Sequence, residues 1–136
     1  MDIRKFAMSS ILGGTAYFFA TWLVYGVLLF DLTALPEDVR AVIQYPPEEF
    51  RMSLMIVSCL VIGGLYALIL NWAQGASFAS GFRVCAIVGA LITLAVGLSM
   101  ASMFRMNTLD QIAINTVADA LCSGLAGGVI GYYLGR

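Results

Sequence analysis

Asp119 is the one charged residue inside a long apolar segment of this 136-residue chain. It follows Asp110 by nine residues, which is about 13 Å along a helix axis. In a membrane-spanning helix this position lies near the middle of the bilayer. An ionised carboxylate there costs roughly 2.5 to 3.5 kcal/mol on insertion scales. We therefore expect Asp119 to face protein rather than lipid, and to be either protonated or hydrogen-bonded.

The expected partners of Asp119 are uncharged, since no lysine or arginine lies within a predicted span. On its own helix the candidates are Asn115, Thr116 and Ser123. The candidates on the other predicted helices are Thr15, Tyr17, Thr21, Ser58, Thr93 and Ser99. Two interpretations stay open: a neutral acid that holds helices together through hydrogen bonds, or a relay for protons or cations of the kind found in transporters.

Small residues recur at intervals of four along the same segment. Helices in lipid gain little by burying apolar surface against each other, so close backbone contact between small residues holds them together. The predicted helix-packing residues are Gly124, Gly127, Gly128, Gly131 and Gly135. The pattern alone leaves open whether this face packs within the chain or against a second copy.

Methionines gather near the end of one predicted span and the start of another, on the same side of the membrane. They are Met52, Met55, Met100, Met103 and Met106. Thioethers are soft ligands that select copper(I), but methionine is also a common flexible filler in apolar helices. Because no histidine or cysteine accompanies the cluster, we prefer the filler interpretation and keep a copper(I) site as an alternative.

Catalytic and cofactor motifs are missing from the sequence. The chain has no histidine, which is the usual general base near neutral pH and the commonest metal ligand. The glycine pairs lie inside apolar segments and are not followed by the Lys-Ser or Lys-Thr of a phosphate loop. We therefore expect no enzymatic activity and no cofactor. The net charge is −1 with no basic cluster, so nucleic acid is not an expected partner.

The composition indicates a membrane protein. Hydrophobic residues make up 61% of the chain and charged residues 11%, whereas about 25% of residues in soluble domains are charged. Segments of about 20 apolar residues can cross a membrane as helices. Four segments meet this length, at residues 6–30, 52–72, 84–104 and 111–134. We predict one all-α domain over residues 1–136, a polytopic membrane protein built as an antiparallel bundle of four transmembrane helices.

The connections carry local start signals for helices. Residues 31–51 form an acidic loop, in which Pro36 followed by two acids favours a short helix of about two turns on the membrane surface. An ordinary loop with a single helical turn is the open alternative. Residues 73–81 are rich in glycine and serine and predict a turn, so that the third helix opens near Phe82. Thr108 and Gln111 have the spacing of a capping box for the fourth helix.

The orientation follows the positive residues at the start of the chain. Arg4 and Lys5 precede the first predicted span, and positive flanks stay on the cytoplasmic side. We therefore expect a multi-pass protein of the inner (cytoplasmic) membrane with both termini in the cytoplasm.

The first two predicted spans share a small pattern. Gly13-Gly14 stands eight residues before Trp22, and Gly63-Gly64 stands eight residues before Trp72. An inverted repeat would place such pairs in antiparallel helices. Because so few residues match, chance similarity is the preferred interpretation.

Three stretches together carry a resemblance to known sequences. They are Gly13 to Tyr17 with Trp22 to Gly26 and Asp31, Asn71-Trp72 with Gly81, and Gly127 to Tyr132. With them the chain resembles an uncharacterised family of small bacterial four-helix integral membrane proteins, a domain of unknown function. The resemblance implies fold and membrane location and no activity.

Asp31 has an unfavourable position in this pattern. It follows the first span, and the dipole at a helix C-terminus disfavours an anion. A pairing with Arg51 or Arg105 on the same side would relieve this, and we state it as a hypothesis. A solvated charge that marks the helix end is the competing interpretation.

Three functions remain as expectations. A structural or accessory protein, which assembles as a homo-oligomer or within a larger membrane complex, ranks first because it explains the packing faces and the absence of catalytic motifs. A small proton- or cation-coupled transporter or channel using Asp119 is the first alternative. A copper(I)-handling protein using the methionines is the second.

Overall fold

Four long helices make up most of the chain. A computed structural model describes residues 2–33, 36–104 and 108–136. The long helices are α1 (Ile3–Leu23), which continues into the π-helical turn η1 (Val24–Leu28), α4 (Met52–Trp72), α5 (Phe78–Met103) and α6 (Leu109–Leu134). Each is long and apolar enough to cross a membrane. No strand occurs in the described part of the chain, so the predicted all-α class is confirmed.

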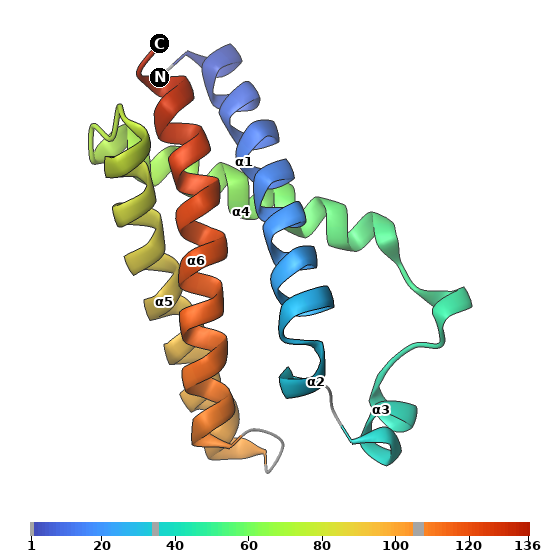
Figure 1. The fold of residues 1–136 in the computed structure, drawn as a ribbon. Coiled ribbons are helices and arrows are strands. Elements are labelled where there is room, and N and C mark those ends of the chain that lie inside the picture. The colour runs from blue at the N-terminus through green and yellow to red at the C-terminus, as the bar shows by residue number, and fades with distance from the viewer. Residues whose placement is uncertain (1, 34–35, 105–107) are drawn as a thin grey trace.

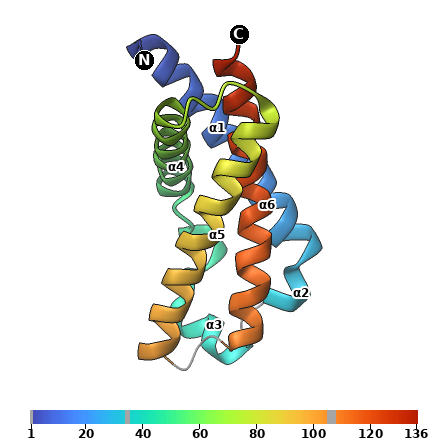
Figure 2. The same ribbon diagram turned by 90° about the vertical axis from the view of Figure 1, so that its left-hand side faces the viewer.

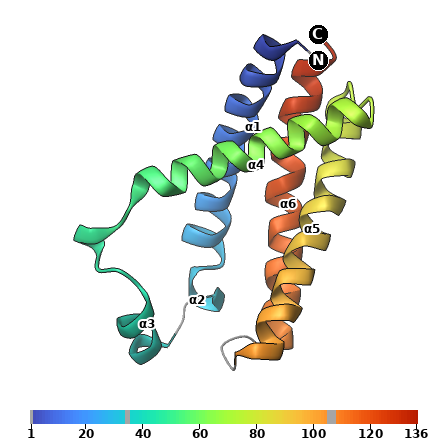
Figure 3. The same ribbon diagram turned by 180° about the vertical axis from the view of Figure 1, so that it is seen from behind.

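The four helices are not aligned along one direction. In Figure 1, α6 lies between α1 and α5, and these three helices run lengthwise through the molecule. Figure 3 shows α4 lying across α1 and α6 at a steep angle. From the side, α5 and α6 run together in opposite directions while α4 is seen nearly end-on (Figure 2). The structure thus contains the four predicted helices, but α4 departs from the arrangement expected of an antiparallel bundle.

The third helix begins earlier than predicted. It starts at Phe78, and the segment from there to Gly81 is helical rather than part of a turn. The reason is a capping box: the Ser77 hydroxyl accepts from the Ser80 backbone N–H at 3.2 Å, and the Ser80 hydroxyl accepts from the Ser77 N–H at 3.2 Å. These bonds satisfy backbone donors that a helix start leaves unpaired. Arg83 therefore lies inside α5.

Two other local predictions are confirmed. The Gln111 N–H donates to the Thr108 hydroxyl at 3.3 Å, and the Thr108 N–H donates to the Gln111 side-chain oxygen at 3.1 Å, which completes the capping box of α6. In the acidic loop the short helix expected after Pro36 is α3 (Glu37–Ile43). The same connection also holds α2 (Phe30–Thr33) and the single turn η2 (Pro47–Glu49).

The glycine face of α6 packs against the first half of α5. A Cβ added to Gly81 would overlap the backbone carbonyl oxygen of Gly127, so the two helices touch through their backbones. The other predicted packing residues also meet the start of α5 or the residues before it. Gly124 meets the Phe82 ring, Gly128 the Phe78 ring, Gly131 the Ser77 carbonyl and Gly135 the Ala76 carbonyl. The choice left open by the sequence is therefore decided in favour of packing within the chain.

The glycine pairs of α1 and α4 meet where these helices cross. A Cβ on Gly14 would lie 2.8 Å from the Cys59 carbonyl oxygen, and a Cβ on Gly63 would lie 3.0 Å from the Gly14 Cα. A Cβ on Gly13 would in turn lie 3.6 Å from the Gly63 Cα. A side chain at Gly14 or Gly63 would therefore push the two helices apart, whereas the contact of Gly13 with Gly63 is an ordinary one.

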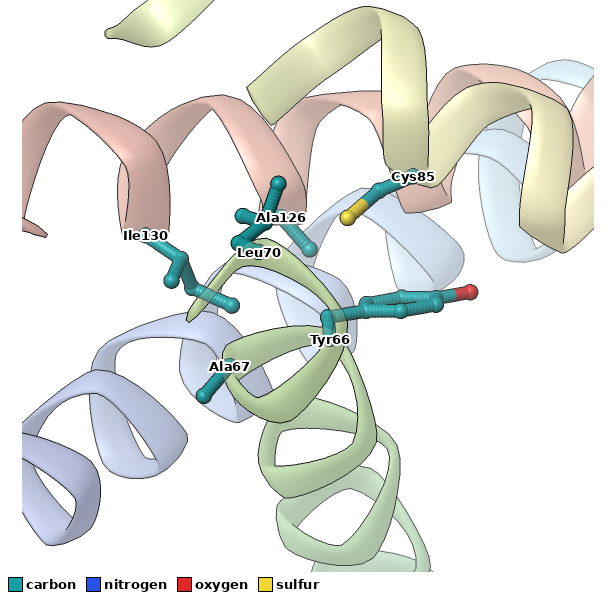
Figure 4. Packing of buried hydrophobic residues seen from close by; sticks show 6 residues of the cluster. All are labelled: Tyr66, Ala67, Leu70, Cys85, Ala126 and Ile130. Carbon is teal, nitrogen blue, oxygen red and sulfur yellow. The ribbon is translucent and has the colours of Figure 1, made fainter. Parts of the chain in front are cut away.

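The apolar core lies where α4 passes over α5 and α6. Figure 4 shows its six residues, which come from the second half of α4 and from the facing sides of α5 and α6. They are Tyr66, Ala67, Leu70, Cys85, Ala126 and Ile130. The first half of α4 extends away from the other helices (Figures 1 and 3), and its large apolar residues Leu54, Val57 and Val61 are exposed.

Candidate polar site around Asp119

Asp119 is buried at the centre of the molecule. It lies on α6, the helix between α1 and α5, and only 8% of its surface is exposed. The expectation that Asp119 faces protein is confirmed by this position.

Two hydroxyl groups from other helices bind the carboxylate directly. The Tyr17 hydroxyl on α1 donates to Oδ1 of Asp119 at 2.6 Å, and the Thr93 hydroxyl on α5 donates to Oδ2 at 2.6 Å. Distances of about 2.5 to 2.7 Å are typical of O–H groups that donate to a carboxylate. Each carboxylate oxygen therefore has a strong donor, and the two donors join α1 and α5 to α6.

A second hydroxyl pair lies one turn along α6. The Tyr66 hydroxyl on α4 donates to the Ser123 hydroxyl at 2.6 Å. Ser123 in turn lies 3.5 Å from Oδ2 of Asp119, at the limit of a hydrogen bond. The Tyr17 and Tyr66 rings meet edge to face, with centroids 6.3 Å apart. Side chains from all four long helices thus converge on one polar cluster, which consists of Asp119, Ser123, Tyr17, Tyr66 and Thr93.

The predicted partners on the helix of Asp119 itself play lesser roles. Only Ser123 reaches the carboxylate, and it does so at the long distance given above. The Thr116 hydroxyl donates instead to the Ile112 carbonyl oxygen of its own helix at 2.8 Å. The side-chain Oδ1 of Asn115 is buried and has no hydrogen-bond partner. These residues lie three or four positions from Asp119 and so share its side of the helix, but a hydrogen bond to the backbone or a long distance keeps two of them from binding the carboxylate closely.

Only some of the predicted partners of Asp119 on other helices reach its carboxylate. Tyr17 and Thr93 bind Asp119, whereas Thr15, Ser58 and Ser99 are exposed. Thr21 lies beside Cys122 on α6.

Tyr25 also belongs to the site. Its hydroxyl donates to the backbone carbonyl oxygen of Asn115 at 3.1 Å. Tyr25 sits in the π-helical turn η1 at the end of α1. Such turns inside a longer helix are rare and occur often at functional sites.

A pocket of about 390 Å³ opens beside Asp119. All four long helices contribute to its wall, and η1 adds Tyr25. The polar residues of the wall are Tyr17, Tyr25, Tyr66, Thr93, Asn115 and Asp119. The apolar ones are Ile62, Ile92, Val96, Gly97, Met100 and Ile112. The volume falls at the lower end of the range for small-molecule sites, about 300 to 1,000 Å³.

The methionines considered as copper(I) ligands are not gathered in one place. Met52 opens α4 and Met103 closes α5, and these two helix ends lie apart in Figures 1 and 3. Met100 instead lines the pocket beside Asp119. Met106 lies outside the described residues. No group of three His, Cys, Asp or Glu side chains suited to a metal ion occurs in residues 2–33, 36–104 and 108–136.

Asp31 does not pair with Arg51 in the structure. Asp31 is an exposed residue of α2, and the Arg51 guanidinium lies over the Tyr45 ring, 5.4 Å from its centroid. This half of the hypothesis is wrong, because Arg51 has an aromatic partner in the loop. Arg105, the other proposed partner, lies outside the described residues.

Comparison of the chain with protein-family models, with curated proteins and with solved structures gives no match. The resemblance to a family of small bacterial membrane proteins stays a prediction, and the function must be argued from the site.

Proposed function

We propose that this chain is a structural or accessory protein of the inner (cytoplasmic) membrane, which crosses the bilayer four times and assembles as a homo-oligomer or within a larger membrane complex. The observation that carries this proposal is the polar cluster, in which hydroxyl groups from three other helices meet the acid and the serine of α6. The hydrogen bonds of this cluster hold the helices together.

These hydrogen bonds between helices matter because lipid removes the usual driving force for helix association. Apolar helices gain little by touching each other in hydrocarbon, so packing of small residues and hydrogen bonds between helices hold a bundle together. This chain has both: backbone contact between α5 and α6 at Gly81 and Gly127, and the donors around Asp119. Each oxygen of the buried carboxylate accepts a hydrogen bond from another helix, so the acid connects α1 and α5 to α6.

The proposal also places both termini in the cytoplasm. The start of α1 and the end of α6 lie at the same end of the molecule (Figure 1). Arg4 and Lys5 lie at this end, and positive residues favour the cytoplasmic side. This supports one side for both termini, with the acidic loop and α3 on the opposite side.

Assembly requires a surface other than the glycine face, because α5 already covers it. The first half of α4 offers exposed apolar side chains that extend beyond the other helices.

The test is native mass spectrometry of the protein released from lipid discs, for the wild type and for Asp119→Asn. We expect an oligomer or a complex with other subunits. Because the polar cluster around Asp119 holds the helices that carry the assembly surface, we also expect a lower melting temperature, measured by circular dichroism, and weaker assembly in the variant. A monomer without partners, together with an unchanged melting temperature for the variant, would contradict the accessory role.

A second candidate function, a small proton- or cation-coupled transporter, is favoured by one observation: Asp119 forms part of the wall of an open pocket. Its test is pH-dependent flux in proteoliposomes. If Asp119→Asn leaves assembly intact and abolishes the flux, transport is the function; if the variant only weakens assembly, the accessory role stands.

A further inference from the structure

The pocket beside Asp119 is rich in hydrogen-bond acceptors. A carboxylate offers about four acceptor positions, and three hydroxyl groups contact the one at Asp119, one of them at 3.5 Å. Oδ1 of Asn115, four residues earlier on the same helix, is buried without any partner. Residues four apart lie on the same side of a helix, and Asn115 and Asp119 both line the pocket.

The phenol protons of the pocket are already used. Tyr17 donates to Asp119, Tyr66 donates to Ser123, and Tyr25 donates to the Asn115 carbonyl oxygen. These hydroxyl groups therefore have no proton left for an anionic or acceptor-bearing ligand. Their rings still present aromatic surface, and ring faces attract ammonium groups. None of the described lysines or arginines lines the pocket, so no protein cation competes for Asp119.

The rest of the wall is apolar and opens on the outer side of α5. Ile92, Val96 and Met100 line the pocket and are themselves exposed. In a membrane this side meets the lipid chains. A ligand that fits must therefore carry one charged donor group at its inner end and an apolar body at its outer end.

We propose that the pocket binds a small amphiphilic primary amine, with its ammonium group between Asp119 and Asn115 and its apolar body along α5. The amine is the substrate class for the second candidate function, the transporter, and the inference rests on the same pocket. Binding is measured without flux, so binding in the absence of transport would leave this inference standing while the transport function fails.

The experiment is equilibrium dialysis of the full chain in lipid discs against labelled 2-phenylethylammonium, with empty discs to subtract partition into lipid. We expect saturable binding of one amine per chain. The neutral isostere 2-phenylethanol should bind at least about ten-fold more weakly, because hydrogen bonds between charged groups are the strong ones. The anion 3-phenylpropanoate should not bind.

Two variants locate the binding. Asp119→Asn should weaken amine binding at least about ten-fold and remove the preference over the alcohol. Val96→Trp fills the outer part of the pocket and does not touch the hydrogen bonds of Asp119, so it should abolish binding while the protein stays folded. Its matched control is Leu94→Trp, an exposed position of α5 outside the pocket, which should bind as the wild type does.

Equal binding of amine and alcohol, binding that survives Val96→Trp, or the absence of saturable binding would each overturn the inference. If Asp119→Asn fails to fold, the comparison of Val96→Trp with Leu94→Trp decides the matter alone.

Discussion

Replacing Tyr17 by phenylalanine removes one hydroxyl group and leaves the ring in place. That hydroxyl donates to Oδ1 of Asp119 at 2.6 Å, and no other donor contacts this oxygen in the described structure. Hydrogen bonds between membrane helices average only about 0.6 kcal/mol, whereas bonds to charged groups contribute about 1.5 to 3 kcal/mol. Because the acceptor is a buried carboxylate oxygen, we expect the second range to apply. The free energy of unfolding should fall by about 2 kcal/mol.

The assay is reversible unfolding in mixed micelles, followed by circular dichroism. Tyr25→Phe is the matched control, since it deletes the same group from the same helical segment, but its hydroxyl donates to a neutral backbone carbonyl at 3.1 Å. That variant should lose only about 0.5 to 1.5 kcal/mol. In an Asp119→Asn background Tyr17→Phe should cost at least about 1 kcal/mol less than in the wild type, because the two groups interact.

Equal losses for Tyr17→Phe and Tyr25→Phe, or additive effects of Tyr17→Phe and Asp119→Asn, would refute the reasoning. Either result would mean that the carboxylate is not the partner that makes the Tyr17 hydroxyl important.

Three further changes test other parts of the structure by the same unfolding measurement. Gly81→Ala should destabilise by about 1 to 3 kcal/mol, because its Cβ would overlap the Gly127 carbonyl. In the control Gly26→Ala the Cβ would make only an ordinary contact with the Trp22 ring at 3.6 Å, so this variant should be neutral or stabilise by up to about 1 kcal/mol. Destabilisation by both substitutions would contradict the proposed role of the Gly81 contact. Ser77→Ala removes the N-cap of α5 and should cost about 1 kcal/mol, and no loss would show that the capping box is dispensable. Thr93→Val should cost less than Tyr17→Phe, about 1 to 2 kcal/mol, because Ser123 still lies near Oδ2; an equal or larger cost would argue against this compensation.

The sequence by itself determined the helices and most of their ends. Four apolar segments are long enough to span a membrane, and such segments form helices since lipid offers no hydrogen bonds to the backbone. The capping box of Thr108 and Gln111 and the short helix after Pro36 were also predictable, because both depend on residues within one turn of each other. The start of α5 was missed although its signal is also local, the capping box of Ser77 and Ser80. Gly81 was interpreted as a turn residue, whereas it contacts α6.

The tertiary structure alone decided which of these helices meet and through which side chains. The spans are apolar on nearly every side, so no polar face marks the side that turns inward. Nine polar residues were candidates for Asp119, and only the rotation and crossing of the helices selects Tyr17 and Thr93 from them. The same rotation closes the glycine face of α6 within the chain, brings Tyr25 to the pocket and keeps the methionines of α4 and α5 apart. Contacts between helices depend on positions distant in the chain, and this is the information that local spacing does not contain.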